Sequence, residues 1–263
     1  MDKREVIKTG DVVMFSGNSP TGFLLKTFVS SEWNHSGVAV RFKKEAGKYT
    51  VSLTNEGELY ILDTNTGIRR DDVFGYDTEG AAFSRADQVF SKYNKIAVRH
   101  LRENFRNEEL AALTMEFSKK YRGNLFPGSV LPFISVWLGI PFLEKEISPQ
   151  KSEDMFCSEL TAYYYAYCVG PQYERQVETT LEHEIAGQSR NLLGKLFGKG
   201  SPEARELFTP GHYAKTLTPN ASIFSGEEII IYTHHADLYY VILQPFVIIV
   251  AIMLAIWASL PKE

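Results

Sequence analysis

Two short segments carry residue types that together could perform nucleophilic chemistry. Residues 152–160, SEDMFCSEL, place Cys157 in the first turn of a predicted helix, and residues 33–40, WNHSGVAV, place His35 at the mouth of a predicted strand. The positive end of a helix dipole favours the thiolate form of a cysteine. A neighbouring imidazole can take up the thiol proton and later return it to a leaving group. The pair predicts a cysteine nucleophile with His35 as its acid and base.

A third polar group is expected to orient the imidazole and fix its tautomer. Asp63 is the candidate, because it lies at the end of the predicted strand 59–64; Asn65 is the reserve. The alternative for Asp63 is a cap on the turn that follows. Cys157 and His35 have structural alternatives as well, a small buried core residue and a hydrogen-bonded core histidine. Cys168, late on a tyrosine-rich helix, is predicted to be such a core residue.

The elements that would position these residues can be read from hydrophobic periodicity. Asn107 is predicted to cap a helix that has acidic residues in its first turn and ends at Gly123. The cysteine helix is predicted over residues 154–168. Strands are predicted at 12–15, 36–42, 49–53, 59–64, 95–100 and 228–232. This order predicts an α+β domain in which helices pack on an antiparallel sheet.

Composition narrows the class of function. The chain has 263 residues, a net charge of −4 and scattered basic residues, which argues against a nucleic-acid partner. The two cysteines lack zinc or redox spacing, so neither a metal nor a cofactor is expected. On one helix they would lie roughly 16 Å apart, too far for a disulfide, which favours a reducing compartment. His234, His235 and Asp237 could bind a metal, but a juxtamembrane hinge at 234–237 is the preferred interpretation.

Residues 238–260 form an uncharged apolar stretch close to the C-terminus. As a helix it would measure roughly 34 Å, enough to cross a hydrocarbon core of about 30 Å. We expect a transmembrane helix there, followed by the short tail 261–263. Because so little follows it, we expect a single-pass tail anchor at a membrane, with the domain in the cytosol; the flanking charge of Lys262 argues for the opposite orientation. The apolar stretch 128–142 is either a packed core segment or an apolar lip for an acyl chain.

Several motifs resemble the circularly permuted NlpC-type branch of the papain-like thiol hydrolases. They are Thr9–Val13 (TGDVV), Trp33–Val38 (WNHSGV), Leu59–Asp63 (LYILD), Phe156–Leu160 (FCSEL) and the Thr-Pro segment at 208–213 (FTPGHY). The histidine precedes the cysteine in that branch, as it does here. Bacterial and poxviral proteins belong to it, as do lecithin–retinol acyltransferase and its relatives. The resemblance covers about residues 8–233, with Asp63 where the family commonly has Glu or His.

The resemblance implies a papain-like domain over 1–233 and thiolate attack on an amide or ester carbonyl. Cys157 would be the nucleophile, His35 the acid and base, and Asp63 the orienting residue. We expect a membrane-anchored hydrolase or acyltransferase that acts on lipid or lipid-linked substrates and has the bilayer as a partner. The alternatives are a cysteine peptidase or deamidase acting on proteins, and a catalytically silent membrane scaffold such as a virion structural protein.

Overall fold

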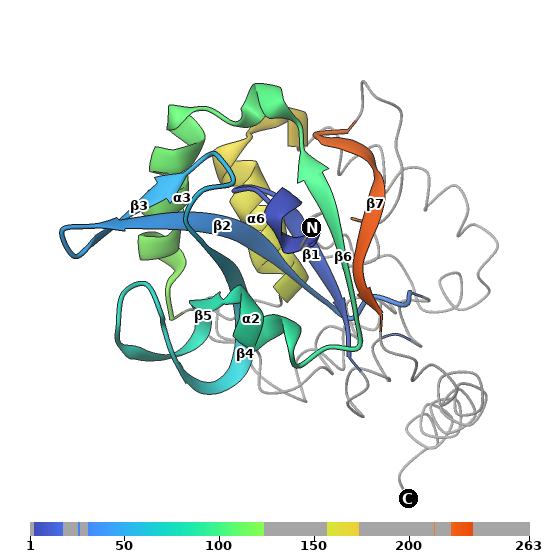
Figure 1. Cartoon of the computed structure of the whole chain (residues 1–263), viewed down its shortest axis with the longest axis horizontal. Coiled ribbons are helices and arrows are strands. Elements are labelled where there is room, and N and C mark those ends of the chain that lie inside the picture. The colour runs from blue at the N-terminus through green and yellow to red at the C-terminus, as the bar shows by residue number, and fades with distance from the viewer. Residues whose placement is uncertain are drawn as a thin grey trace, which may run out of the picture.

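Antiparallel strands make up most of the described protein. The computed structural model describes residues 3–17, 26, 31–123, 157–173, 213 and 222–233. The strands are β1 (Val12–Ser16), β2 (His35–Glu45), β3 (Lys48–Ser52), β4 (Glu58–Arg70), β5 (Asp77–Arg85), β6 (Lys95–Leu101) and β7 (Phe224–Thr233). They form one sheet in the order β5-β4-β2-β1-β6-β7, with β3 paired to β2 (Figure 1). All the pairings between them are antiparallel.

Within the described residues, few helices accompany this sheet. They are η1 (Lys3–Val6), α2 (Ala86–Phe90), η2 (Glu103–Phe105), α3 (Glu108–Tyr121) and α6 (Cys157–Cys168). In Figure 1, α3 and α6 lie behind the sheet, on the same side of it. The sheet is therefore the frame, and two helices cover one of its faces.

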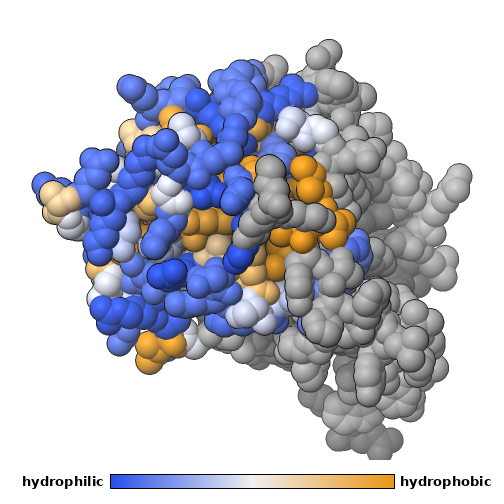
Figure 2. All heavy atoms as spheres, in the orientation of Figure 1, coloured by the Kyte–Doolittle hydropathy of each residue, from blue (hydrophilic) through white to orange (hydrophobic). Residues whose placement is uncertain are grey.

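Side chains alternate between the two faces of the sheet, as the pleat requires. On the face of α3 and α6, the strand residues of the core include Val12, Met14, Val38, Val40, Leu62 and Ala97. On the opposite face, their neighbours pack with α2 and Ile7; these are Val13, Phe15, Ala39, Ile61, Ile96 and Val98. Figure 2 shows apolar side chains gathered over the middle of the molecule, with polar side chains around them to the left. Both faces of the central strands are thus buried, and this makes the sheet a rigid platform.

Helix α3 begins where its sequence predicts. The Asn107 side chain accepts a hydrogen bond from the Leu110 amide at 2.9 Å, which is an N-cap. Glu108 and Glu109 lie in the first turn, where the helix dipole favours negative charge. The helix ends at Tyr121, and Gly123 follows with a positive φ of 71°. The predicted helix between Asn107 and Gly123 is confirmed.

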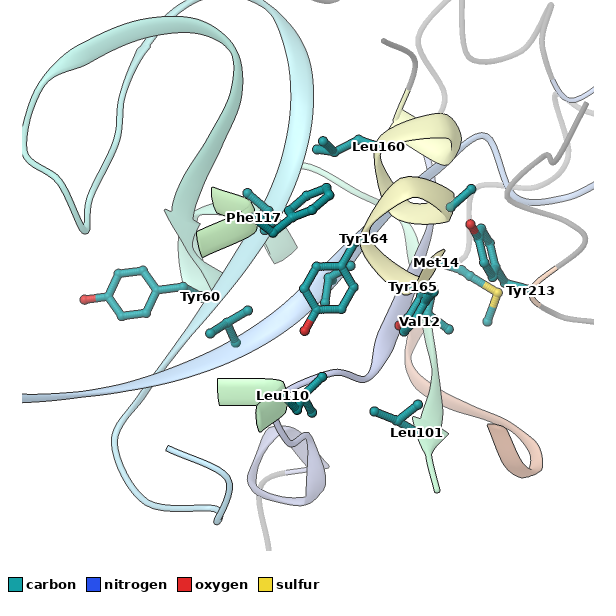
Figure 3. Close-up of a cluster of buried hydrophobic side chains, with 14 of the residues drawn as sticks. Val12, Met14, Tyr60, Leu101, Leu110, Phe117, Leu160, Tyr164, Tyr165 and Tyr213 are labelled. Atoms are coloured by element: carbon teal, nitrogen blue, oxygen red, sulfur yellow. The ribbon is translucent and has the colours of Figure 1, made fainter. Parts of the chain in front are cut away.

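Helix α6 is held against the sheet and against α3 by its tyrosines. Tyr164 forms a T-shaped contact with Phe117 of α3, at 5.4 Å between ring centroids. The Tyr165 hydroxyl donates to the Gly10 carbonyl oxygen at 2.9 Å, just before β1 begins. Figure 3 shows Tyr164, Tyr165 and Leu160 extending from α6 into the cluster that contains Val12 and Met14 of β1. These contacts determine where the start of α6, and hence Cys157, meets the sheet.

The predicted fold class needs correction. The described residues are mostly antiparallel sheet with few helices, and none of these helices is long and apolar enough to cross a membrane. The longest, α3, has 14 residues and would measure about 21 Å, short of a hydrocarbon core of about 30 Å.

The transmembrane helix expected at 238–260 lies outside the described residues, as do the hinge at 234–237 and the tail at 261–263. That prediction rested on the sequence alone and finds no support in the structure. We therefore withdraw the single-pass anchor, and with it the membrane localisation and the cytosolic orientation. The helix expected near residues 180–198 and the apolar stretch 128–142 also lie outside the described part.

Candidate functional site

The candidate site lies at the end of the sheet where β1 finishes and β2 starts. His35 is the first residue of β2 and pairs with Phe15 of β1. Cys157 is the first residue of α6 as described. The Ser36 hydroxyl lies 3.3 Å from the Thr161 hydroxyl, which donates to the Cys157 carbonyl oxygen at 2.8 Å. This chain of contacts ties the start of α6 to the residue beside His35.

The structure brings Cys157, His35 and Asp63 together. The His35 Nε2 atom lies 2.7 Å from the Asp63 Oδ2 atom, and Cys157 is close enough to the same imidazole to raise its pKa. Because Nε2 is engaged by Asp63, Nδ1 is the ring nitrogen left for the sulfur. The side chains lie in the interior, with relative exposures of 7% for Cys157, 8% for His35 and 1% for Asp63. Thiol, imidazole and carboxylate therefore follow one another in the order that a thiol hydrolase requires.

A glycine sets the spacing between the strands of His35 and Asp63. Gly37 lies on β2, and a Cβ atom placed there would come 2.7 Å from Ile61 Cγ2, 2.9 Å from the Leu62 oxygen and 3.1 Å from Asp63 Cβ. A contact under 3.0 Å with a backbone atom requires the strands to move. Gly37 thus permits the close approach of β2 and β4 on which the His35–Asp63 hydrogen bond depends.

The imidazole also lies against two aromatic rings. Tyr93 stacks on it with 8° between the ring planes and 5.6 Å between centroids, and the Phe15 ring is 5.5 Å away. Nearby, Asn34 exchanges two 3.0 Å hydrogen bonds with the backbone of Gly17, which packs against Tyr93. These neighbours restrict rotation of the ring, so its two nitrogens stay directed at different partners.

The electrostatics of the site favour the charged forms of His35 and Asp63. Burial alone would lower the pKa of His35, but the negative charge of Cys157 and the bonds to Asp63 and Cys157 raise it to about 10. Burial alone would raise the pKa of Asp63. The positive charges of Arg69 and then His35 outweigh burial and lower it to about 2. The surroundings of His35 therefore favour a protonated imidazole next to an ionised carboxylate.

A second histidine–carboxylate contact lies elsewhere in the fold. His100 Nδ1 is 2.8 Å from Asp11 Oδ2, and the Asp11 carboxylate also accepts from the Lys8 and Leu101 amides and from Arg106. With its oxygens shared among so many donors, Asp11 anchors the start of β1 to β6. Cys168 contacts Tyr164 and Thr114 instead, and burial raises the pKa of its thiol to about 12. The Cys157 thiol is thus the one that meets an imidazole.

Sequence reasoning missed three neighbours of the site: Arg69, Tyr93 and Asn34. Arg69 Nη1 lies 2.6 Å from Asp63 Oδ1, at an angle that makes the contact an ion pair rather than a hydrogen bond. Asn34 adjoins His35 in the sequence, so its position was a usable signal. Tyr93 and Arg69 belong to no motif. The Asn65 side chain, the reserve candidate, is outside the described part, as are the pair His234 and His235.

Comparisons with known proteins extend this description only slightly. No family model matches the sequence, and no curated protein matches it. Among solved structures, the chain is similar to the metalloprotein yiiX of Escherichia coli O157:H7. The TM-score is 0.40 and the identity 14%, over 62% of this chain and 67% of that one. A likeness at this level carries no argument about function.

Proposed function

We propose that this protein is a cysteine-dependent hydrolase or acyltransferase that cleaves an ester or amide through an acyl-thioester on Cys157. The observation that carries the proposal is that one imidazole, His35, contacts a buried carboxylate at 2.7 Å and lies close enough to Cys157 for the two groups to interact electrostatically. The resemblance of the His-Ser-Gly and Cys-Ser-Glu-Leu segments to permuted NlpC-type thiol hydrolases supports the same chemistry. Membership of that family is part of the proposal.

The reaction follows from the order of the three groups. The Cys157 thiolate attacks the carbonyl carbon, and a C–S bond forms as the C–O or C–N bond breaks. The His35 imidazolium gives its proton to the departing alcohol or amine. Water, or an acceptor alcohol or amine, then attacks the thioester while His35 takes up its proton, and the Cys157 thiolate is released. Asp63 stays ionised throughout and holds the ring in place.

The substrate class that we propose is an acyl ester or amide of a lipid or lipid-linked molecule. Support comes from the resemblance to lecithin–retinol acyltransferase relatives and from the apolar stretch 128–142, which precedes the cysteine helix in sequence. A peptide substrate is the alternative, and a silent scaffold is the outcome if the thiol proves inert.

The test uses a small tagged chloroacetamide with four proteins: the wild type, Cys157→Ala, Cys168→Ala and His35→Gln. We expect strong labelling of the wild type and of Cys168→Ala, no labelling above background for Cys157→Ala, and slower labelling for His35→Gln. Cys168→Ala is the matched control, since it removes the other thiol of the chain. Equal labelling of the wild type and Cys157→Ala would refute the nucleophile.

A second step identifies the substrate. Intact-mass measurement after addition of an activated fatty-acyl ester should show one acyl group on the wild type and none on Cys157→Ala. Panels of phospholipids, acyl amides and peptides then separate the lipid proposal from the peptide alternative. Turnover of peptides alone would replace the proposed substrate class and leave the thiol mechanism in place.

A further inference from the structure

The two oxygens of the Asp63 carboxylate meet different partners. Oδ2 meets His35 Nε2 at 2.7 Å, and Oδ1 meets Arg69 Nη1 at 2.6 Å. The Asp63 side chain is only 2% exposed, so water does little to stabilise its charge. A carboxylate buried to this degree depends on its partners, and Arg69 is the partner with a permanent charge.

Arg69 is itself fixed by the backbone around it. Its Nη2 atom donates to the carbonyl oxygens of Asp63 at 2.5 Å, Gly80 at 3.1 Å and Ala82 at 3.3 Å. Its Nη1 atom donates to the Ser84 hydroxyl at 3.3 Å. The guanidinium is thus bound across β4 and β5 before any substrate arrives, and its position requires no rearrangement during a reaction.

A bulge in β4 makes this contact possible. Asp63 pairs with Ala82 and Arg69 with Thr78, and the register shifts between Asn65 and Ile68. Six residues of regular strand would separate Asp63 from Arg69 by roughly 20 Å, whereas the facing four residues of β5 span roughly 13 Å. The bulge therefore brings Arg69 within reach of Asp63, in the way that bulges redirect side chains beside active sites.

We infer that Arg69 is a positioning residue of the proposed thiol site, which keeps Asp63 ionised and turned toward His35 and so sets the pH range in which Cys157 reacts. The inference rests on the proposed function. Within the described residues, the titratable and charged groups that face this cluster are Cys157 from α6, His35 from β2, Asp63 and Arg69 from β4, Tyr93 from the segment before β6, and Tyr213, which interacts with Cys157. In the series Cys157, His35, Asp63 and Arg69, each group lies next to one that can carry the opposite charge. Arg69 is the last group of the series.

The sign of the effect is fixed by electrostatics. Removing the positive charge of Arg69 raises the affinity of the remaining groups for protons, so both pH limbs of thiol reactivity move to higher pH. Arg69 is in direct contact with Asp63. An arginine in direct contact with a carboxyl group shifts the pKa of that group by about one unit or more. A loss of folded protein, in contrast, lowers reactivity at every pH and leaves the limbs where they were.

The experiment measures the rate of iodoacetamide alkylation of Cys157 between pH 4 and 10, in a Cys168→Ala background. The variants are Arg69→Gln, which removes the charge but keeps amide hydrogens for the carbonyl oxygens, and Arg69→Lys, which keeps the charge. Arg70→Gln is the matched control, because it removes the same charge from the next residue of β4, which is exposed. We expect an alkaline shift of about one pH unit for Arg69→Gln and none for Arg70→Gln. Arg69→Lys should return the limb to within a few tenths of a unit of the parent.

Each outcome decides. An unshifted limb in folded Arg69→Gln overturns the inference and leaves the proposed function intact. A parent protein whose Cys157 reacts like an ordinary exposed thiol sinks the proposed function instead. If Arg69→Gln does not fold while Arg69→Lys does, the charge serves folding rather than the thiol, and the inference is overturned. An equal shift in Arg70→Gln overturns it as well, since the effect would then be one of net charge.

Discussion

Replacing Gly37 with alanine tests the close approach of β2 and β4 on which the His35–Asp63 contact depends. The added methyl group would meet the Leu62 carbonyl oxygen at 2.9 Å and Ile61 Cγ2 at 2.7 Å. One of these two atoms belongs to the backbone of β4 and cannot rotate away, so β2 and β4 must separate by a few tenths of an ångström or more. Overpacking of this kind costs about 1 to 3 kcal/mol, and each kcal/mol lowers the melting temperature by about 2 to 4 °C in a chain of this size.

The same separation acts on the site. A displacement of this kind stretches the 2.7 Å bond between His35 and Asp63, and a misplacement of about 1 Å can lower catalysis about 100-fold. We therefore expect Gly37→Ala to slow both alkylation of Cys157 and ester turnover by at least tenfold in protein that circular dichroism shows to be folded.

A matched control separates the site from stability. Gly47, in the turn between β2 and β3, has a φ of 81° and nothing within 4 Å of a Cβ atom, so Gly47→Ala costs about 1 kcal/mol through backbone strain alone. It should lower the melting temperature and leave thiol reactivity unchanged. If both variants lose stability equally and neither changes reactivity, the strand spacing does not govern the site and the reasoning is wrong.

Three further predictions concern stability. Because the pKa of Asp63 is lowered, its ionised form stabilises the fold above about pH 4, by about 2 kcal/mol. This contribution is lost as the pH falls toward 2. In urea unfolding, the wild type should therefore lose more free energy of unfolding over this pH range than Asp63→Asn. The raised pKa of His35 has the opposite sign: its contribution is complete below about pH 6.5 and is lost as the pH approaches 10, so the wild type should lose more stability over that interval than His35→Gln. Asn107→Ala should cost about 1 kcal/mol by removing the cap of α3, whereas Asn107→Asp should retain most of it; equal melting temperatures for the two variants would contradict the cap.

Local signals in the sequence predicted much of the frame. Apolar runs between turns and, for β2, an alternation of apolar residues located β1, β2 and β6 to within a few residues, and the cap at Asn107 located α3. Strand β5 was missed because its sequence, DTEGAAFSR, is small and polar and lacks a long apolar alternation. It is a strand because β4 supplies a partner, which is a tertiary effect that local propensity does not report.

The residues of the candidate site likewise fall into those that local sequence signals predicted and those that depend on tertiary structure. Cys157, His35 and Asp63 each stood at the end of a predicted element, so their meeting followed from a correct guess of which strands are neighbours. Arg69 could not be predicted, because its contact with Asp63 depends on a bulge that shortens β4 relative to β5. The transmembrane prediction erred for a different reason: hydropathy reports only how apolar a segment is, and the helix that it would require was assumed.

The distribution of the site along the chain has a consequence for synthesis. His35 leaves the ribosome long before Cys157, and at 5 to 20 residues per second the delay is roughly 6 to 25 s. During that interval the half-built sheet holds a base without its nucleophile, and the newly made thiol stays unactivated until α6 docks through Thr161 and Tyr165. Reactivity of Cys157 toward a small electrophile would then mark chains in which α6 has docked, so that pulse-labelling of translating ribosomes could follow formation of the site directly.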